Sequence, residues 1–320
     1  MGTFRNILVY TSGDAADDAA LVQAASVARR TGGRLRLIDV LSELPHELYR
    51  LFGSMGAHDV RELAAQNRRD ALERMAVPLR SEGLKITTTV RWGRPFLEVV
   101  RAVVADGHDL VVAATDSLRP GLDYTTHRTV RVCPVPVWAA RAPLSATSPK
   151  ILAAVDATLH QRRRNVFDTR VLAEAKALAE LLEGELHVVH AWHVVDAAGL
   201  HLPSAVPVER VREYGRGSRD RHAKWLTELM ADVGVSLPPD HVHLIEGAAD
   251  VAVTRTAYDI GAELIVMGTV RTAGEGGFFV GQVAEGILER LVVSLFAVKP
   301  DGFVTPVQVP PHEGTLAVGE

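Results

Sequence analysis

The sequence contains an internal repeat whose two copies each extend over roughly 150 residues, a length that indicates duplicated domains rather than a solenoid of short units. Both copies open on a short apolar run, at 6–10 and at 150–154. Further along, the segment 107–114 aligns with the segment 261–268. A chain built in this way is expected to fold as two similar domains, each with a core of its own.

Within each copy, apolar runs typical of buried strands alternate with segments of helical periodicity. Five strands joined by crossover helices predict a mainly parallel sheet, so we expect an α/β fold of two tandem five-stranded parallel-sheet domains. The helical pattern is clearest at 168–182, where apolar residues recur on one face. The expected strands are 6–10, 34–40, 85–91, 109–114, 135–140, 150–155, 185–192, 241–246, 263–268 and 294–299.

The segment 142–149 combines prolines with small polar residues and has no periodicity, which indicates a linker. We therefore predict domain 1 at 1–143, domain 2 at 149–300 and a C-terminal tail at 301–320. The two domains are expected to pack through their last strands as an internal pseudo-dimer. Whether two such chains form a homodimer stays open.

Composition argues against several classes of function. A net charge of −4 gives no general attraction for phosphate backbones, so we expect no nucleic-acid partner. The apolar runs are too short for a membrane span or for the core of a signal peptide. The one cysteine, Cys133, excludes an intrachain disulfide and a thiolate zinc cage. We therefore expect a globular cytoplasmic protein in which Cys133 acts as a small hydrophobic residue.

Ligands of an open parallel sheet bind at the carboxyl ends of its strands, which directs attention to the glycine-rich segment 268–282. It follows a predicted strand and leads into a predicted helix, so Gly281 and Gln282 would present free N–H groups to a phosphate. The same glycines also fit a plain flexible connection, and both readings remain open. Neither a P-loop nor a dinucleotide fingerprint is spelled, since no Lys-Ser/Thr follows a glycine and Phe279 stands where a third glycine would be needed.

Several segments of the sequence follow a known family pattern. They are 150–156, 186–192, 266–269 and 281–285 in domain 2 and, in weaker form, 7–10, 107–112 and 133–138 in domain 1. Together these segments resemble the universal stress protein domain, and two such domains in one chain resemble the tandem E-type members of that family. The resemblance implies a stress-response binding or sensor protein that acts through ligand-dependent interaction with protein partners.

The nucleotide-binding branch of this family implies an ATP site, with Mg²⁺ on the phosphates. Its phosphate loop has the form Gly-x2-Gly-x9-Gly-Ser/Thr, whereas the sequence here reads Gly268-x2-Arg271-x9-Gly281-Gln282. Arg271 could either fill the phosphate space or donate to an anion. In domain 1, Ser12 replaces the family's acid, so that domain is expected to have lost nucleotide binding. The small-molecule site that the resemblance implies in domain 2 consists of Asp156, Ala191, Met267, Gly268, Arg271, Gly281, Gln282 and Val283.

No catalytic residues are predicted, because none of the common catalytic motifs is present. Two alternatives stay open beside a binding protein. One is a slow ATP hydrolase in which Glu275 or Gln282 orients water. The other is a carrier of a partly apolar, non-nucleotide ligand covered by the loop 197–208. The basic run 162–164 follows the first strand of domain 2 and could attract an anion, although a solvated face explains it as well.

Histidines give a weaker signal. His187 and His190 would point to opposite faces of a strand, which prevents a shared metal site. His241 and His243 share a face, but a zinc site there would need a further ligand from elsewhere. We therefore expect structural histidines and predict no metal site.

Overall fold

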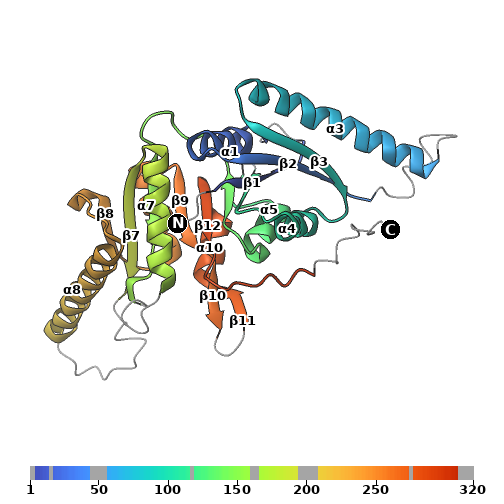
Figure 1. Ribbon diagram of the computed structural model, residues 1–320. Helices are drawn as coiled ribbons and strands as arrows, with labels where there is room; N and C mark the ends of the chain where they lie inside the picture. The colour runs from blue at the N-terminus through green and yellow to red at the C-terminus, as the bar shows by residue number, and fades with distance from the viewer. Residues whose placement is uncertain are drawn as a thin grey trace, which may run out of the picture. The chain divides into compact units, whose positions relative to one another are not determined.

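The structure is a computed structural model that describes residues 4–13, 17–43, 56–115, 119–158, 166–193, 208–273 and 277–308 (Figure 1). The chain divides into two compact units, one formed mainly by 3–116 and 123–143 and the other mainly by 144–302. They are called domain 1 and domain 2 below. All ten predicted strands are present, with ends that move by two residues at most.

Domain 1 is a parallel sheet in the order β3-β2-β1-β4-β5, with helices on both faces (Figure 1). The helices α1 and α3 cover one face, and α4 and α5 cover the other. The strands are β1 (Asn6–Thr11), β2 (Arg34–Leu41), β3 (Lys85–Trp92), β4 (Leu110–Ala114) and β5 (Val137–Ala140). The helices are α1 (Asp17–Thr31), α3 (Ala57–Ser81), α4 (Pro95–Asp106) and α5 (Tyr124–Val132).

Domain 2 repeats this arrangement in the order β12-β9-β6-β7-β8, again with parallel pairing throughout. Its strands are β6 (Lys150–Ala154), β7 (Glu185–Trp192), β8 (Val242–Glu246), β9 (Leu264–Gly268) and β12 (Ser294–Val298). The helices are α7 (Val166–Leu182), α8 (Val208–Val233), α9 (Ala249–Ile260) and α10 (Gln282–Arg290), and a 3-10 turn, η2 (Pro239–His241), precedes β8. The α/β fold with two tandem parallel-sheet domains is therefore confirmed.

Burial explains why the sequence predicts these elements so well. The central strands are enclosed on both faces, so they read as continuous apolar runs rather than as alternating patterns. The apolar stripe predicted for α7 is buried in full, at Val171, Leu172, Ala175, Leu178, Ala179 and Leu182. Cys133 is buried, as expected.

The aligned segments 107–114 and 261–268 mark the same structural event in both domains. Gly107 ends α4 at φ 63°, and Gly261 ends α9 at φ 66°. Both glycines adopt the left-handed conformation that stops a helix without a Cβ penalty. The chain then passes directly into β4 or β9.

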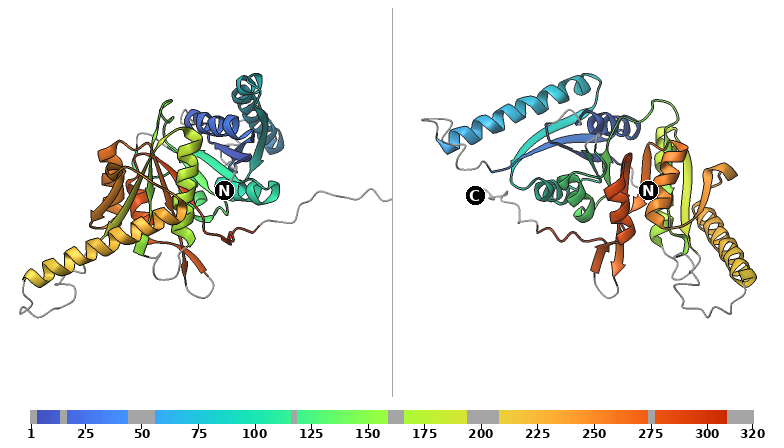
Figure 2. Two further views of the ribbon diagram at one scale, coloured as in Figure 1. Left: turned by 60° about the vertical axis from the view of Figure 1, so that its left-hand side comes forward. Right: turned by 180° about the vertical axis from the view of Figure 1, so that it is seen from behind.

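The segment 268–282 is not an open glycine-rich loop. Most of it forms an antiparallel hairpin of β10 (Val270–Ala273) and β11 (Gly277–Val280), which extends beyond the strands of the main sheet (Figure 2). Backbone pairing joins Val270 to Val280 and Arg271 to Phe279. The ladder forms because residues before and after 274–276 pair with each other, which glycine content alone does not predict.

Within the described residues, no helix combines the length and the apolar character that crossing a membrane requires. The predictions for 162–164, for Glu275 and for 197–207 lie outside the residues that the structure describes. Of the tail, 301–308 is described. The internal pseudo-dimer, the homodimer and the domain boundaries stay predictions.

Candidate ligand site at the carboxyl ends of the strands

Strand order in domain 2 reverses at β6, because β7 and β8 lie on one side of it and β9 and β12 lie on the other. In open α/β sheets, ligands bind in the crevice beside such a reversal, at the carboxyl ends of the strands. Ala154, the last residue of β6, pairs with Val189 of β7 and with Met267 of β9. The topology therefore brings Asp156, Ala191, Met267 and Gly268 together at the carboxyl ends of these strands, as the sequence predicts. This end of the sheet is called its carboxyl edge.

The backbone around Asp156 is fixed by a neighbouring carboxylate. The Asp156 N–H donates to Asp168 Oδ1 over 2.9 Å, and Asp168 is buried in the first turn of α7. Asp156 Oδ1 in turn accepts the N–H of Thr158 over 3.1 Å. Asp156 itself is half-buried, so its carboxylate can reach a ligand at this edge. The sequence gives no sign of Asp168, because twelve residues separate it from Asp156.

An aromatic ring lies over Gly268 at the same edge. A Cβ atom added to Gly268 would overlap Cε1 and Cζ of Phe167, which belongs to the first turn of α7. A side chain at position 268 would therefore require the Phe167 ring to move, so packing favours glycine there. The ring also makes the wall beside Gly268 apolar, and no sequence motif marks Phe167, which is 101 residues away along the chain.

The hairpin returns the chain to this edge. Because Val270 pairs with Val280, the start of α10 lies close to the end of β9. Gly281 is the N-cap residue of α10, it is buried, and it provides no side-chain cap. The first N–H groups of α10, from Gln282 onward, are thus not capped by Gly281, which leaves a helix start suited to an anion.

The remaining predicted residues are placed less decisively. Arg271 lies in β10, and the structure describes its backbone pairing but not its side chain. The Gln282 side chain is likewise not described. Val283 is 40 % exposed. The roles of these three residues stay predictions.

Domain 1 has the same backbone anchor but a different helix start. Asp17, buried in the first turn of α1, accepts the N–H groups of Ser12 and Gly13 over 3.0 and 2.7 Å, as Asp168 accepts that of Asp156. The helix α5, equivalent to α10, begins after Asp123, whose carboxylate accepts the Thr126 N–H over 3.0 Å. A built-in anion thus occupies the position that an added phosphate would need.

Strand register shows that Asp39 of domain 1 and His190 of domain 2 are equivalent. Asn6 pairs with Arg34, and Lys150 pairs with Glu185, so each residue lies five positions further along its strand. Asp39 forms an ion pair with Arg68 of α3. His190 Nε2 lies 2.8 Å from His222 Nδ1 of α8. Both pairs join the second strand of a domain to the helix that follows it.

The two pairs differ in charge. In domain 2, burial lowers the pKa of His190 and of His222, so the pair favours neutral imidazoles. In domain 1, burial raises the pKa of Asp39, and the Arg68 guanidinium opposes that rise. Burial and the nearby Asp39 carboxylate also raise the pKa of Tyr10 to about 12.

A cavity of about 330 Å³ adjoins the ion pair of domain 1. Its lining is polar on the sheet side and partly apolar on α3, and it includes Thr11, Asp17, Asp39, Arg68, Leu72 and Met75. Domain 1, which is expected to have lost nucleotide binding, therefore still contains a space at its carboxyl edge.

Comparison with known proteins covers both domains. The model of the family described as "Universal stress protein family" matches residues 3–141 and 148–299. The protein named universal stress protein E of Escherichia coli K12 is 26 % identical over 98 % of this chain and 99 % of its own length. The protein of the same name from Photorhabdus laumondii is 24 % identical over 96 % of this chain and 99 % of its own length.

Solved structures show the same fold. A protein of Pseudomonas aeruginosa PAO1, described as functionally unknown, has a TM-score of 0.67 at 24 % identity and covers 93 % of both chains. A universal stress protein from Archaeoglobus fulgidus has a TM-score of 0.63 at 19 % identity, covering 92 % of this chain and 97 % of its own.

Proposed function

Since this chain belongs to the universal stress protein family, we propose that it is a stress-response binding protein whose second domain binds an adenine nucleotide. The adenine end of the ligand would lie at Asp156, and its phosphates would lie at the start of α10. Mg²⁺ would accompany the phosphates. The ligand would then control the protein's interaction with partner proteins.

One observation carries this proposal, namely the contrast between Gly281 and Asp123. Both are N-cap residues of equivalent helices at the carboxyl edge of their sheets. Asp123 caps its helix with a carboxylate, whereas Gly281 adds no side chain and no charge. An anion at α10 would therefore meet N–H donors and the positive end of the helix dipole, while an anion at α5 would meet a carboxylate.

The test is calorimetric titration of ATP with Mg²⁺ into the purified chain, after mass spectrometry for a co-purified ligand. One site per chain is expected. The decisive variant is Gly281→Asp, which gives α10 the cap that α5 already has. Because Asp is a favoured N-cap residue, the helix should persist while nucleotide binding is lost.

The matched control is Asp123→Ser, which keeps a side-chain cap in domain 1 and should leave ATP binding unchanged. Asp156→Ala should weaken binding at the adenine end, and circular dichroism checks that each variant folds. Wild-type chain that binds no ATP, or a folded Gly281→Asp variant that binds as tightly as the wild type, would refute the proposal.

The Phe167 ring favours a second candidate, a carrier of a partly apolar, non-nucleotide ligand. The ring lies against Gly268, where the family pattern implies a phosphate contact. Phe167→Ala should open this space, and the two candidates predict different effects on ligand binding. ATP affinity should rise or stay unchanged for a nucleotide site, whereas a co-purified apolar ligand should be lost if the carrier function is correct.

A further inference from the structure

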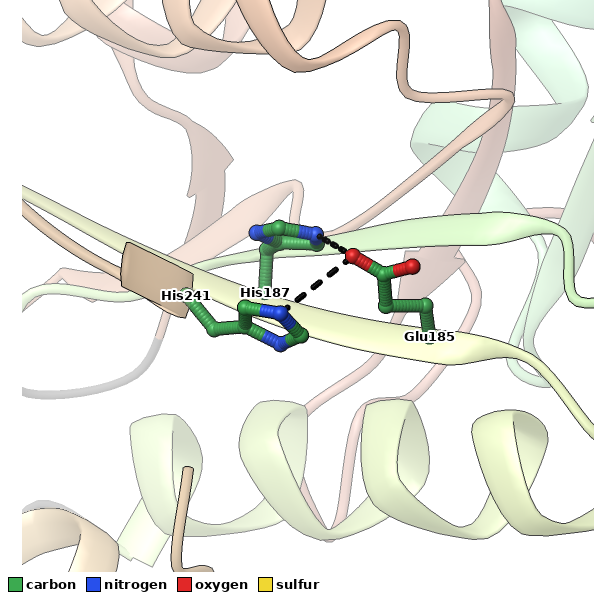
Figure 3. A group of neighbouring side chains, drawn as sticks. All are labelled: Glu185, His187 and His241. Atoms are coloured by element: carbon green, nitrogen blue, oxygen red, sulfur yellow. Dashed lines mark hydrogen bonds and ion pairs between the residues drawn. The ribbon is translucent and has the colours of Figure 1, made fainter. Parts of the chain in front are cut away.

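Four side chains gather near the amino ends of two neighbouring strands of domain 2, β7 and β8. Glu185 and His187 lie on β7, His241 ends η2, and His243 lies on β8. One ligand atom from each of Glu185, His187 and His241 lies within 4.8 Å of the others. Figure 3 shows both imidazoles directed at the Glu185 carboxylate. We propose that Glu185, His187 and His241 bind a zinc ion.

The distances suit a metal site. Glu185 Oε1 lies 2.8 Å from His187 Nε2 and 3.3 Å from His241 Nε2. Ligand atoms held about 2.1 Å from a tetrahedral zinc ion lie about 3.4 Å from one another, and the stacked His187 and His241 rings would have to turn apart to direct both lone pairs at one ion. Two histidines and one glutamate form a known zinc ligand set that leaves a fourth position for water.

Hydrogen bonds at the outer nitrogens orient the two rings. His241 Nδ1 lies 3.1 Å from the Leu186 carbonyl oxygen, to which it can only donate, so its neutral form presents a lone pair at Nε2. His187 Nδ1 lies 3.1 Å from His243 Nε2, and donation to His243 would free the Nε2 lone pair of His187 as well. Metal-bound histidines characteristically donate their other N–H in this way.

A proton or a metal ion would stabilise the contact between two of these atoms. Neutral His241 Nε2 and ionised Glu185 Oε1 are both acceptors, and they face each other at 3.3 Å. Either the proton of an imidazolium or a metal ion can occupy the contact. The 2.8 Å contact of His187 Nε2 with the same oxygen fits either a hydrogen bond or two ligands of one ion, and zinc binding distinguishes the two.

Burial and charge are consistent with this proposal. The His187 side chain is 5 % exposed, whereas those of Glu185 and His241 are 31 % and 19 % exposed, so an ion can enter from one side. The stacking of His187 on His241 at 4.2 Å disfavours two charged rings. Lys150 is a nearby positive charge, but its Nζ donates to the Ile260 carbonyl oxygen, and Glu185 offsets part of its repulsion.

The location implies a structural role for the ion. Two ligands come from β7 and the third precedes β8, which is the outermost strand of this sheet in domain 2. Bound zinc would therefore link the edge strand to the interior of the sheet. Because the cluster lies at the amino end of β7, it is separate from the ligand site at the opposite edge and does not depend on the proposed function.

The test measures zinc affinity of the full chain, first freed of metal with a chelator, by competition with a chromophoric chelator. One zinc per chain is expected, together with a rise in Tm. Glu185→Gln, His187→Gln and His241→Gln should each weaken binding at least tenfold. His58→Gln is the control, since the His58 side chain is 92 % exposed, and it should leave the affinity unchanged.

Cobalt substitution gives an independent readout, because a tetrahedral site with imidazole ligands produces strong visible absorption that Glu185→Gln or His241→Gln should remove. These two variants keep the test valid even if the buried His187→Gln variant fails to fold. Failure of the wild-type chain to bind one zinc, or unchanged affinity in both Glu185→Gln and His241→Gln, would overturn the proposal.

Discussion

Replacing Arg68 with methionine would leave the Asp39 carboxylate without its guanidinium partner in domain 1. The Asp39 side chain is 4 % exposed and that of Arg68 is 26 % exposed. Breaking a fully buried pair typically costs about 3–5 kcal/mol, and breaking an exposed pair costs about 0–1 kcal/mol. Because Arg68 lines a cavity of about 330 Å³ that water can enter, we expect an intermediate loss of about 2 kcal/mol at neutral pH.

The loss should depend on pH in a defined direction. Burial raises the pKa of Asp39, and Arg68 opposes that rise, so the pKa should climb further in Arg68→Met. An acid whose pKa is higher in the folded than in the unfolded state loses stability as the pH rises from the unfolded to the folded value. The destabilisation should therefore be larger at pH 8 than at pH 5, because a larger share of Asp39 is protonated at the lower pH and a protonated carboxyl needs no counter-charge.

Hydrogen exchange followed by mass spectrometry suits this prediction, because peptides from β2 and α3 report on domain 1 alone. Arg69→Met on the same helix is the control, since Arg69 pairs with Glu62 at the surface, and it should change stability by less than about 0.5 kcal/mol. Equal losses at both pH values would show that packing of the Arg68 stem matters rather than charge. No loss at either pH would show that water already solvates Asp39.

Three further predictions concern single sites. Gly268→Ala should destabilise domain 2 by about 2 kcal/mol in urea unfolding, because its Cβ would overlap the Phe167 ring, and Phe167→Leu should recover part of the loss. Gly261→Ala should lower the free energy of unfolding by about 1 kcal/mol through backbone strain alone, since the new Cβ would meet no neighbouring atom within 4 Å. An unchanged free energy of unfolding would contradict the left-handed conformation of this helix cap. Hydrogen bonds from Arg80 and Thr88 lower the pKa of Glu73 to about 2, so its carboxyl NMR signal should stay that of an ionised group until about pH 2, and Arg80→Gln should raise that midpoint.

Most of the fold can be predicted from the sequence because its information is local. Buried parallel strands read as unbroken apolar runs, and Gly107 and Gly261 mark the ends of equivalent helices. The hairpin cannot be predicted in this way, because its glycines are equally typical of a flexible loop, whereas the ladder depends on pairing between Val270 and Val280.

The site could be predicted only in part, because its partners meet through the fold. The family resemblance indicates Asp156, but nothing in sequence spacing indicates that Asp168 holds its N–H or that Arg68 reaches Asp39. The predicted separation of His187 from His190 is confirmed, since strand alternation is a local rule. The meeting of His187 with His243, 56 residues later, requires the register of β7 with β8.

The shared carboxylate anchor suggests how a duplicated gene could diversify. Asp17 and Asp168 accept the equivalent backbone N–H in their respective domains. Removing either carboxylate would leave a partly buried N–H at the end of a strand without this acceptor. Beside this anchor, domain 1 contains the Asp39–Arg68 ion pair, and domain 2 contains the His190–His222 pair of imidazoles. Because the anchor is the same in both domains, substitutions beside it can change what one domain binds while the other domain keeps its own binding properties.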